Sequence, residues 1–284
     1  MSPTPVDAPA SSFLARNEFL LRRLHSLSGL VPVGAYMVVH LLTNARVLDS
    51  AAAFQNSVYL IHSVGKLLPV IEWVFIFIPL LFHAIFGVLI IRGSLPNSGT
   101  YKYPRNINYT LQRATGMIAF VFILWHVFHM HGWIHADWWI KGVAEPLGGA
   151  QFRAYNASST AAEAIQMSAI VPILYAIGVL ATVFHLANGI WTFGITWGLW
   201  VTPPAQRWAL SACLVFGLGL GVVGLSALGG FALMSQEAID QAVAHEEKVR
   251  LAKEASGEIV PDAHKSRPAG TTAAEQEHAA ATPE

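Results

Sequence analysis

The sequence predicts an all-α integral membrane protein, a bundle of five transmembrane helices. Of its 284 residues, 54% are hydrophobic and 12% are charged, far from the balance of a soluble globular protein. Five apolar stretches of about 20 residues are each long enough to cross the hydrocarbon core of a bilayer as a helix. Four of these five stretches hold a histidine well inside the apolar segment. The bilayer is therefore the expected solvent, and the histidines are the first candidates for function.

The chain divides into three parts around these helices. Residues 1–23 form a polar N-terminal segment, residues 24–233 hold the helices, and residues 234–284 form a polar tail. The helices are expected at residues 24–42, 70–91, 115–135, 169–194 and 208–233. In the tail, the Ala-, Glu- and Lys-rich part up to about residue 257 favours helix, whereas 258–284, with its Pro and Thr, is typical of disorder. We expect no cofactor chemistry from the tail.

Basic residues in the short flanks predict the orientation, because Lys and Arg are retained on the cytoplasmic side of a membrane. The flanks on one side hold eight, which are Arg16, Arg22, Arg23, Arg92, Lys102, Arg105, Arg113 and Arg207. The flanks on the other side hold four, which are Arg46, Lys66, Lys141 and Arg153. The N-terminus is therefore expected in the cytoplasm and, after five crossings, the C-terminus outside.

Two features of composition exclude other classes of function. The formal charge is zero and no Lys/Arg-rich block is present, so the chain lacks the electrostatic footprint of a nucleic-acid-binding protein. The single cysteine, Cys213, excludes an internal disulfide, a cysteine-ligated zinc or iron–sulfur site, and covalent haem attachment through two cysteines. Any haem must be held non-covalently.

The histidines His40, His83, His126 and His185 lie on four different predicted helices, and the fifth helix has none. An ionisable side chain at this depth is costly and usually marks a functional site. Neutral imidazole is also the usual axial ligand of non-covalently bound haem iron. One such histidine could equally be a polar residue satisfied by a neighbouring helix, but four on four helices favour haem ligation.

Depth in the membrane sorts these histidines into two pairs. At a rise of about 1.5 Å per residue, His40 and His126 lie roughly 24 and 17 Å from the inner ends of their helices, toward the outer half. By the same rise, His83 and His185 lie roughly 10 and 6 Å above the inner edge of a ~30 Å core. Two b-type haems stacked across the membrane, each with two histidine ligands, require this arrangement. We therefore assign His40 and His126 to an outer haem iron, and His83 and His185 to an inner one.

Glycines and prolines near the histidines add weaker signals. Gly87 and Gly189 each follow an inner histidine by four residues, on the same helix face, and could leave room for a porphyrin plane. Helix packing is the alternative reading of both glycines. Pro79 is expected to bend the second helix, and Pro32 and Pro172 are expected to bend the first and fourth.

Polar residues near the predicted inner face are candidates to hold the haem propionates. His25, Ser26 and Ser28 begin the first helix, and Arg113 precedes the third. For the arginines of this face, topology alone is an alternative explanation.

A further group of histidines is expected at or beyond the outer interface, where a solvated or hydrogen-bonded histidine is ordinary. These are His62, His129, His131 and His135. A metal site built from the last three is disfavoured, because only Asp137 could complete the ligand set.

Four stretches carry a resemblance to a known family: RRLHSLSG at 22–29, PLLFHAIFG at 79–87, LQRATG at 111–116 and FHLANGIW at 184–191. They resemble the cytochrome b membrane anchor of succinate:quinone oxidoreductases, in the single-subunit, five-helix, dihaem type of some bacterial succinate dehydrogenases and fumarate reductases. The resemblance runs from about residue 17 to 233 and does not reach the tail.

The resemblance implies a multi-pass protein of the bacterial cytoplasmic membrane whose axial ligands fall on the same four histidines, with the same pairing. It implies a flavoprotein subunit and an iron–sulfur subunit docked on the cytoplasmic face, and a dicarboxylate active site on the flavoprotein. It also implies membrane quinone, usually menaquinone, as the electron partner. The direction of reaction, succinate oxidation or fumarate reduction, depends on potentials and on the partner subunits.

Glu72 is the leading candidate for proton exchange with the quinone. It is the only carboxylate within or at the edge of the five predicted helices. It precedes His83 by 11 residues, which places it about 16 Å nearer the outer surface, at the level of the outer haem. The alternative is an interfacial carboxylate that faces water.

Two other functions remain open at this point. One is a dihaem cytochrome b of a hydrogenase or formate dehydrogenase, which the neighbouring genes would distinguish. The other is a proton-coupled transporter whose histidines relay protons. The sequence lacks the inverted repeat and broken-helix pairs expected of many transporters, and an absorption spectrum would decide.

Overall fold

The computed structural model describes residues 16–93 and 104–267, and within these ranges the regular elements are all helices. Five of the described helices are long and apolar enough to cross a membrane, and these are Glu18–Leu48, Gly65–Arg92, Asn106–His131, Ile170–Thr196 and Pro203–Ala232. The predicted five-helix membrane architecture is confirmed. The other residues, which include Lys102 and the end of the predicted tail, lie outside the described part of the chain.

The first two spans are each assembled from several helical pieces. The first contains α2 (Glu18–Ser28), a π-helical turn and α3 (Ala35–Ala45), and the second contains α5 (Leu68–Glu72), a π-helical turn and α6 (Ile78–Arg92). Pro32 lies inside the first π turn. A proline cannot donate the usual backbone hydrogen bond, and π turns are one way in which a helix accommodates this.

The remaining spans are continuous helices: α7 (Pro104–His131), α10 (Ile170–Thr196) and α11 (Pro203–Ala232). Two details of the predicted helices are wrong. The third helix ends at His131, before residue 135, because Gly132 and Trp133 adopt positive φ angles of 72° and 66°. Pro172 causes no break, because it lies in the first turn of α10, where the backbone N–H groups have no intrahelical acceptor.

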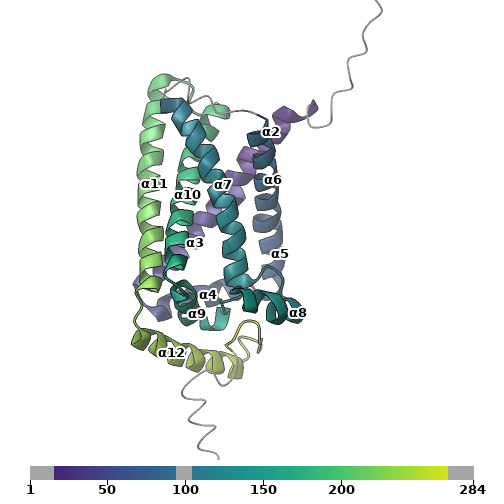
Figure 1. Ribbon diagram of the computed structural model, residues 1–284, viewed down its shortest axis with the longest axis vertical. Coiled ribbons are helices and arrows are strands. Elements are labelled where there is room, and N and C mark those ends of the chain that lie inside the picture. The colour runs from purple at the N-terminus through teal and green to yellow at the C-terminus, as the bar shows by residue number, and fades with distance from the viewer. Residues whose placement is uncertain (1–15, 94–103, 268–284) are drawn as a thin grey trace, which may run out of the picture.

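The spans stand side by side, and α10 packs against both α7 and α11 (Figure 1). Short helices cover the end of the bundle where α7 and α11 finish: α4 (Ala51–His62), α8 (Asp137–Trp139), α9 (Ala157–Gln166) and α12 (Gln236–Ala255). We call this the loop-covered end. The chain enters through α2 at the opposite end, which we call the N-terminal end.

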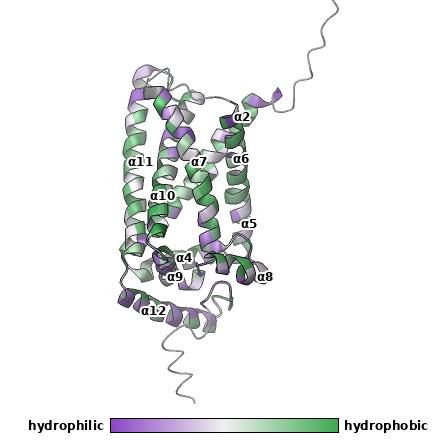
Figure 2. Cartoon of the chain, in the orientation of Figure 1, coloured by the Kyte–Doolittle hydropathy of each residue, from purple (hydrophilic) through white to green (hydrophobic). Residues whose placement is uncertain are grey.

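Hydropathy follows this division. The residues of the spans are predominantly hydrophobic along their length, whereas α12 carries many hydrophilic residues (Figure 2). The main cluster of buried apolar side chains lies at the loop-covered end and includes Phe54, Tyr155, Ile165, Phe231 and Ile239. The short helices and loops there form a packed layer across that end of the membrane helices.

A buried carboxylate anchors α12 in this layer. Glu246, which is 1% exposed, accepts hydrogen bonds from the backbone N–H groups of Ser158 and Ser159, at 2.7 and 3.2 Å. The Ser159 hydroxyl donates a third bond of 2.5 Å. These donors belong to the first turn of α9, where free N–H groups and the helix dipole favour an anion. The carboxylate therefore acts as a cap supplied by a distant helix.

The chain beyond α12 corrects the prediction of disorder from residue 258. Residues 258–267, which we call the C-terminal strap, pack on the loop-covered end. The Tyr155 N–H donates to the Lys265 carbonyl at 2.7 Å, and the Arg267 N–H donates to the Asn156 side-chain oxygen at 3.0 Å. These bonds hold the backbone of the strap against the loop at Tyr155 and Asn156. The polar composition of the strap does not reveal such bonds, and so it suggested disorder.

Candidate functional site

The first candidate site lies near the N-terminal end, where His83 of α6 meets His185 of α10. Their ring centroids are 6.0 Å apart and the ring planes are inclined by 80°. The Nδ1–H of His83 donates to the His25 carbonyl at 2.9 Å, and the Nδ1–H of His185 donates to the Gln112 carbonyl at 3.0 Å. A neutral imidazole that donates through Nδ1 has a free lone pair on Nε2. Both rings are thus in the tautomer that can ligate a metal through Nε2.

Glycines make room for these two rings. A Cβ atom on Gly29 would overlap the His83 ring, and one on Gly116 would lie 2.7 Å from Cε1 of His185. Both glycines lie in the sequence stretches that carried the family resemblance. Their contact with the histidines could not be predicted from sequence spacing, because each glycine and its histidine belong to different helices. Gly87 and Gly189 follow the inner histidines in the sequence, but a Cβ atom added to them would meet other residues: Cε1 of His25 at 3.2 Å and Nε2 of Gln112 at 3.5 Å.

The predicted propionate residues lie around this first pair. The His25 ring stacks on the His83 ring with centroids 4.1 Å apart, and its Nδ1 is buried without a hydrogen-bond partner. The hydroxyls of Ser26 and Ser28 donate to the carbonyls of Arg23 and His25. Arg113 donates to the last carbonyls of α6, Ile90 at 3.1 Å and Ile91 at 3.3 Å. Among these four candidates in the described part of the chain, His25 is the one with a buried side-chain nitrogen that has no hydrogen-bond partner.

The second candidate site lies nearer the loop-covered end, where His40 of α3 meets His126 of α7. Their ring centroids are 5.9 Å apart and the planes are inclined by 68°. His126 Nδ1 lies 3.1 Å from the Tyr175 hydroxyl. The His40 ring stacks on Tyr36 at 5.6 Å, and the Asn44 side chain donates to the His40 carbonyl at 2.7 Å. The structure therefore brings the four histidines together in the same two pairs that their depth in the predicted helices gave.

Both pairs fit a shared iron. A metal-bound imidazole nitrogen lies about 2 Å from the metal, so two imidazoles on opposite sides of one ion have centroids about 6 Å apart. The observed separations are 6.0 and 5.9 Å. Within the described ranges, no group of three or more His, Cys, Asp or Glu residues could hold a metal ion directly. Two-histidine sites of this kind suit a metal whose other ligands come from a macrocycle.

The comparisons with known proteins identify the family. No protein-family model matches the chain. The chain is 36% identical to the succinate dehydrogenase cytochrome b558 subunit of Bacillus subtilis (strain 168) over 214 residues. This alignment covers 75% of the chain and 97% of the relative. The chain belongs to the succinate dehydrogenase cytochrome b subunit family. The resemblance expected from the four sequence stretches is confirmed, and the hydrogenase, formate dehydrogenase and transporter alternatives are set aside.

In this cytochrome b subunit, His129 in the last turn of α7 is one of the hydrogen-bonded histidines. It is only 3% exposed, and its Nδ1 lies 2.8 Å from the Tyr175 hydroxyl. Tyr175 thus stands between His126 and His129. The sequence gave no sign of this, because a tyrosine in an apolar helix resembles an ordinary packing residue.

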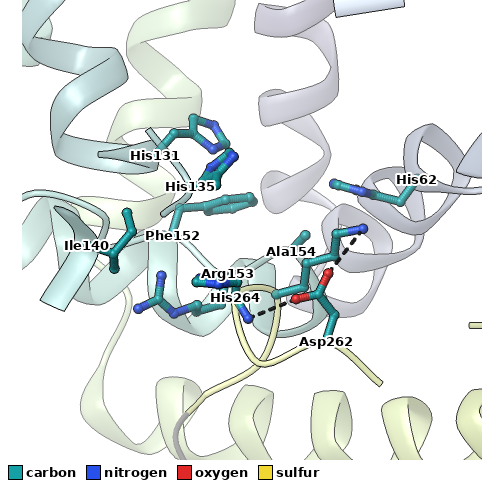
Figure 3. A pocket seen from close by; sticks show the side chains of 10 residues that line it. His62, His131, His135, Ile140, Phe152, Arg153, Ala154, Asp262 and His264 are labelled. Carbon is teal, nitrogen blue, oxygen red and sulfur yellow. Dashed lines mark hydrogen bonds and ion pairs between the residues drawn. The ribbon is translucent and has the colours of Figure 1, made fainter. Parts of the chain in front are cut away.

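A cavity of about 180 Å³ lies at the loop-covered end of the subunit (Figure 3). His62, His131 and His135 line it, together with Asp262 and His264 from the C-terminal strap. Burial lowers the pKa of His62 to about 4 and also lowers the pKa of His135. The C-terminal strap, which the sequence predicted to be disordered, therefore forms one wall of this cavity.

Glu72 ends α5 near the second pair and is partly buried. It is close enough to Tyr36, the residue stacked on His40, to interact with it electrostatically. Lys265 of the strap acts electrostatically on both Glu72 and His62. The predicted proton partner thus lies between the second pair and the strap.

Proposed function

We propose that this chain is the dihaem membrane anchor of a succinate:quinone oxidoreductase, which carries electrons between an iron–sulfur subunit and membrane quinone. One observation supports the proposal above the others: four helices present two histidine pairs, each with the ring separation of two ligands to one iron. When bound, haem b supplies one-electron redox chemistry, and the two iron sites define a path along the bundle.

His83 and His185 are the proposed ligands of the inner iron, and His40 and His126 those of the outer iron. His83 and His185 would present Nε2, because Nδ1 of each donates to a backbone carbonyl. The Tyr175 hydroxyl can pair with Nδ1 of His126 as donor or acceptor, and the Asn44 amide nitrogen lies 3.4 Å from Nε2 of His40. The proposed propionate partners are His25, Ser26, Ser28 and Arg113. Among them His25 is the best supported, since its buried Nδ1 can still accept or donate.

The N-terminal end is the proposed cytoplasmic face, in keeping with its basic flanks. A flavoprotein subunit and an iron–sulfur subunit would dock there, and the dicarboxylate would react on the flavoprotein. Quinone, usually menaquinone in this family, would react near the outer iron with Glu72 as its proton partner. The chain itself would bind no dicarboxylate.

The deciding experiment is a redox titration of the b-type absorption band in the assembled complex, with single histidine substitutions. We expect His83→Ala or His185→Ala to remove one b-type centre, and His40→Ala or His126→Ala to remove the other. His245→Ala, on the exposed side of α12, is the matched control and should retain both. A wild-type complex with a single b-type centre would contradict the dihaem proposal.

A further inference from the structure

The hydroxyl of Tyr175 lies between two histidines of α7, His126 and His129. It is 3.1 Å from Nδ1 of His126 and 2.8 Å from Nδ1 of His129. Tyr175 is 6% exposed and His129 is 3% exposed, so water does not compete freely for these bonds. A hydroxyl has one proton to donate, so it can donate to only one of the two rings.

Aromatic packing holds this arrangement in place. The His129 ring stacks on Trp125 with centroids 5.0 Å apart and planes 7° apart. The His126 ring stacks on Phe122 at 5.7 Å, and Tyr175 meets Phe122 and Trp125 edge-on at 5.5 and 5.2 Å. These α7 residues recur at the spacing of one helix face. Neither the tyrosine nor the histidines can turn without moving a large ring.

The proton positions follow from the role of His126. If His126 ligates through Nε2, its Nδ1 carries the proton and donates to the Tyr175 oxygen. The Tyr175 O–H must then point to His129, whose Nδ1 accepts. The result is a directed chain, His126 to Tyr175 to His129, in which each bond polarises the next.

We infer that Tyr175 and His129 are positioning residues that set the orientation and basicity of the His126 ligand, and thereby the potential of the outer iron. This inference rests on the proposed function, since it takes His126 as an iron ligand. A hydrogen bond accepted from the distal N–H raises the basicity of an imidazole ligand. A more basic ligand stabilises ferric over ferrous iron and lowers the potential. The inner pair has no such side chain, because His83 and His185 donate to backbone carbonyls.

The test is a redox titration of both b-type centres in the assembled complex carrying Tyr175→Phe, which removes the hydroxyl and keeps the ring. We expect the ferrous-to-ferric ratio of the outer centre at a fixed ambient potential to rise several-fold, up to about tenfold, equivalent to about 59 mV for one electron. The inner centre is the internal control and should not shift. Tyr59→Phe is the matched control, because the hydroxyl of Tyr59 on α4 donates to the backbone carbonyl of Tyr155.

A second pair of variants tests His129, the last residue of the hydrogen-bond chain from His126 through Tyr175. His129→Leu removes the acceptor for the Tyr175 hydroxyl and should shift the outer centre in the same direction by a smaller amount. His129→Asn keeps an acceptor near the position of Nδ1 and should restore the potential.

An unshifted outer potential in Tyr175→Phe would overturn the inference, as would equal shifts in both centres. Loss of the outer centre in both Tyr175→Phe and His129→Leu would also overturn it, because the residues would then be needed for assembly and not for tuning. If wild type lacks an outer b-type centre, the proposed function fails instead.

Discussion

The two histidine pairs have nearly equal ring separations, 6.0 Å for the inner pair and 5.9 Å for the outer pair, yet they are held by different means. Backbone carbonyls orient the inner rings, and glycines of neighbouring helices allow them to fit. Side chains orient the outer rings, through the Tyr175 hydroxyl and the Tyr36 ring. The inner site should therefore be sensitive to added volume, and the outer site to the loss of polar groups.

The largest expected effect is at the inner glycines. Gly116→Ala places a Cβ atom 2.7 Å from Cε1 and 3.0 Å from Nδ1 of His185, so the ring must move away from the position that its bond to the Gln112 carbonyl holds. We expect loss of the inner b-type centre with the outer one retained, seen in reduced-minus-oxidised spectra. Overpacking of this kind costs about 1–3 kcal/mol.

Gly219→Ala on α11 is the matched control, because a Cβ atom there would meet nothing within 4 Å. If Gly116→Ala kept the inner centre at its wild-type potential, the glycine would have no part in seating His185.

A smaller effect is expected at Glu72, beside the outer pair. Glu72→Gln removes a proton-exchanging group and retains its shape, so quinone-linked turnover should fall by about 10²-fold, the lower part of the range for general acid–base catalysis. Both b-type spectra and succinate oxidation with a soluble acceptor should persist. Glu237→Gln, an exposed carboxylate of α12, provides the comparison. Unchanged quinone turnover would remove Glu72 from the outer site.

The smallest effect concerns the C-terminal strap, which packs on the loop-covered end. Burial is the main cause that lowers the pKa of His62 from 6.5 to about 4; the positive charge of Lys265 contributes in the same direction and the carboxylate of Asp262 opposes it. The released state of the strap, with His62 exposed, binds a proton more readily than the docked state. Docking is therefore strongest above about pH 6.5 and weakens as the pH falls toward 4.

Hydrogen exchange of residues 258–267, corrected for intrinsic rates, should rise over this pH range, while peptides from the N-terminal end of α11 should not change. His62→Gln should flatten the response. Exchange that stays constant from pH 6.5 to 4 would exclude His62 as the titrating group.

The sequence predicted the membrane helices and the histidine pairs because both depend on local signals. An apolar run reports a span directly, and a rise of about 1.5 Å per residue converts position into depth. Gly29, Gly116 and Tyr175 could not be assigned in this way, since each acts on a histidine of another helix and its role depends on how the helices pack. The strap was mistaken for disorder because its fixed position comes from a few backbone bonds to Tyr155 and Asn156, which composition does not encode.

The docking of α12 through Glu246 gives the molecule an assembly polarity. A soluble subunit that approached the loop-covered end would have to displace α12 and strip a buried carboxylate of its three donors. At the other end the chain presents helix termini and their basic flanks. A soluble partner would therefore meet a steric block at the loop-covered end, and the N-terminal end is the one that α12 leaves accessible.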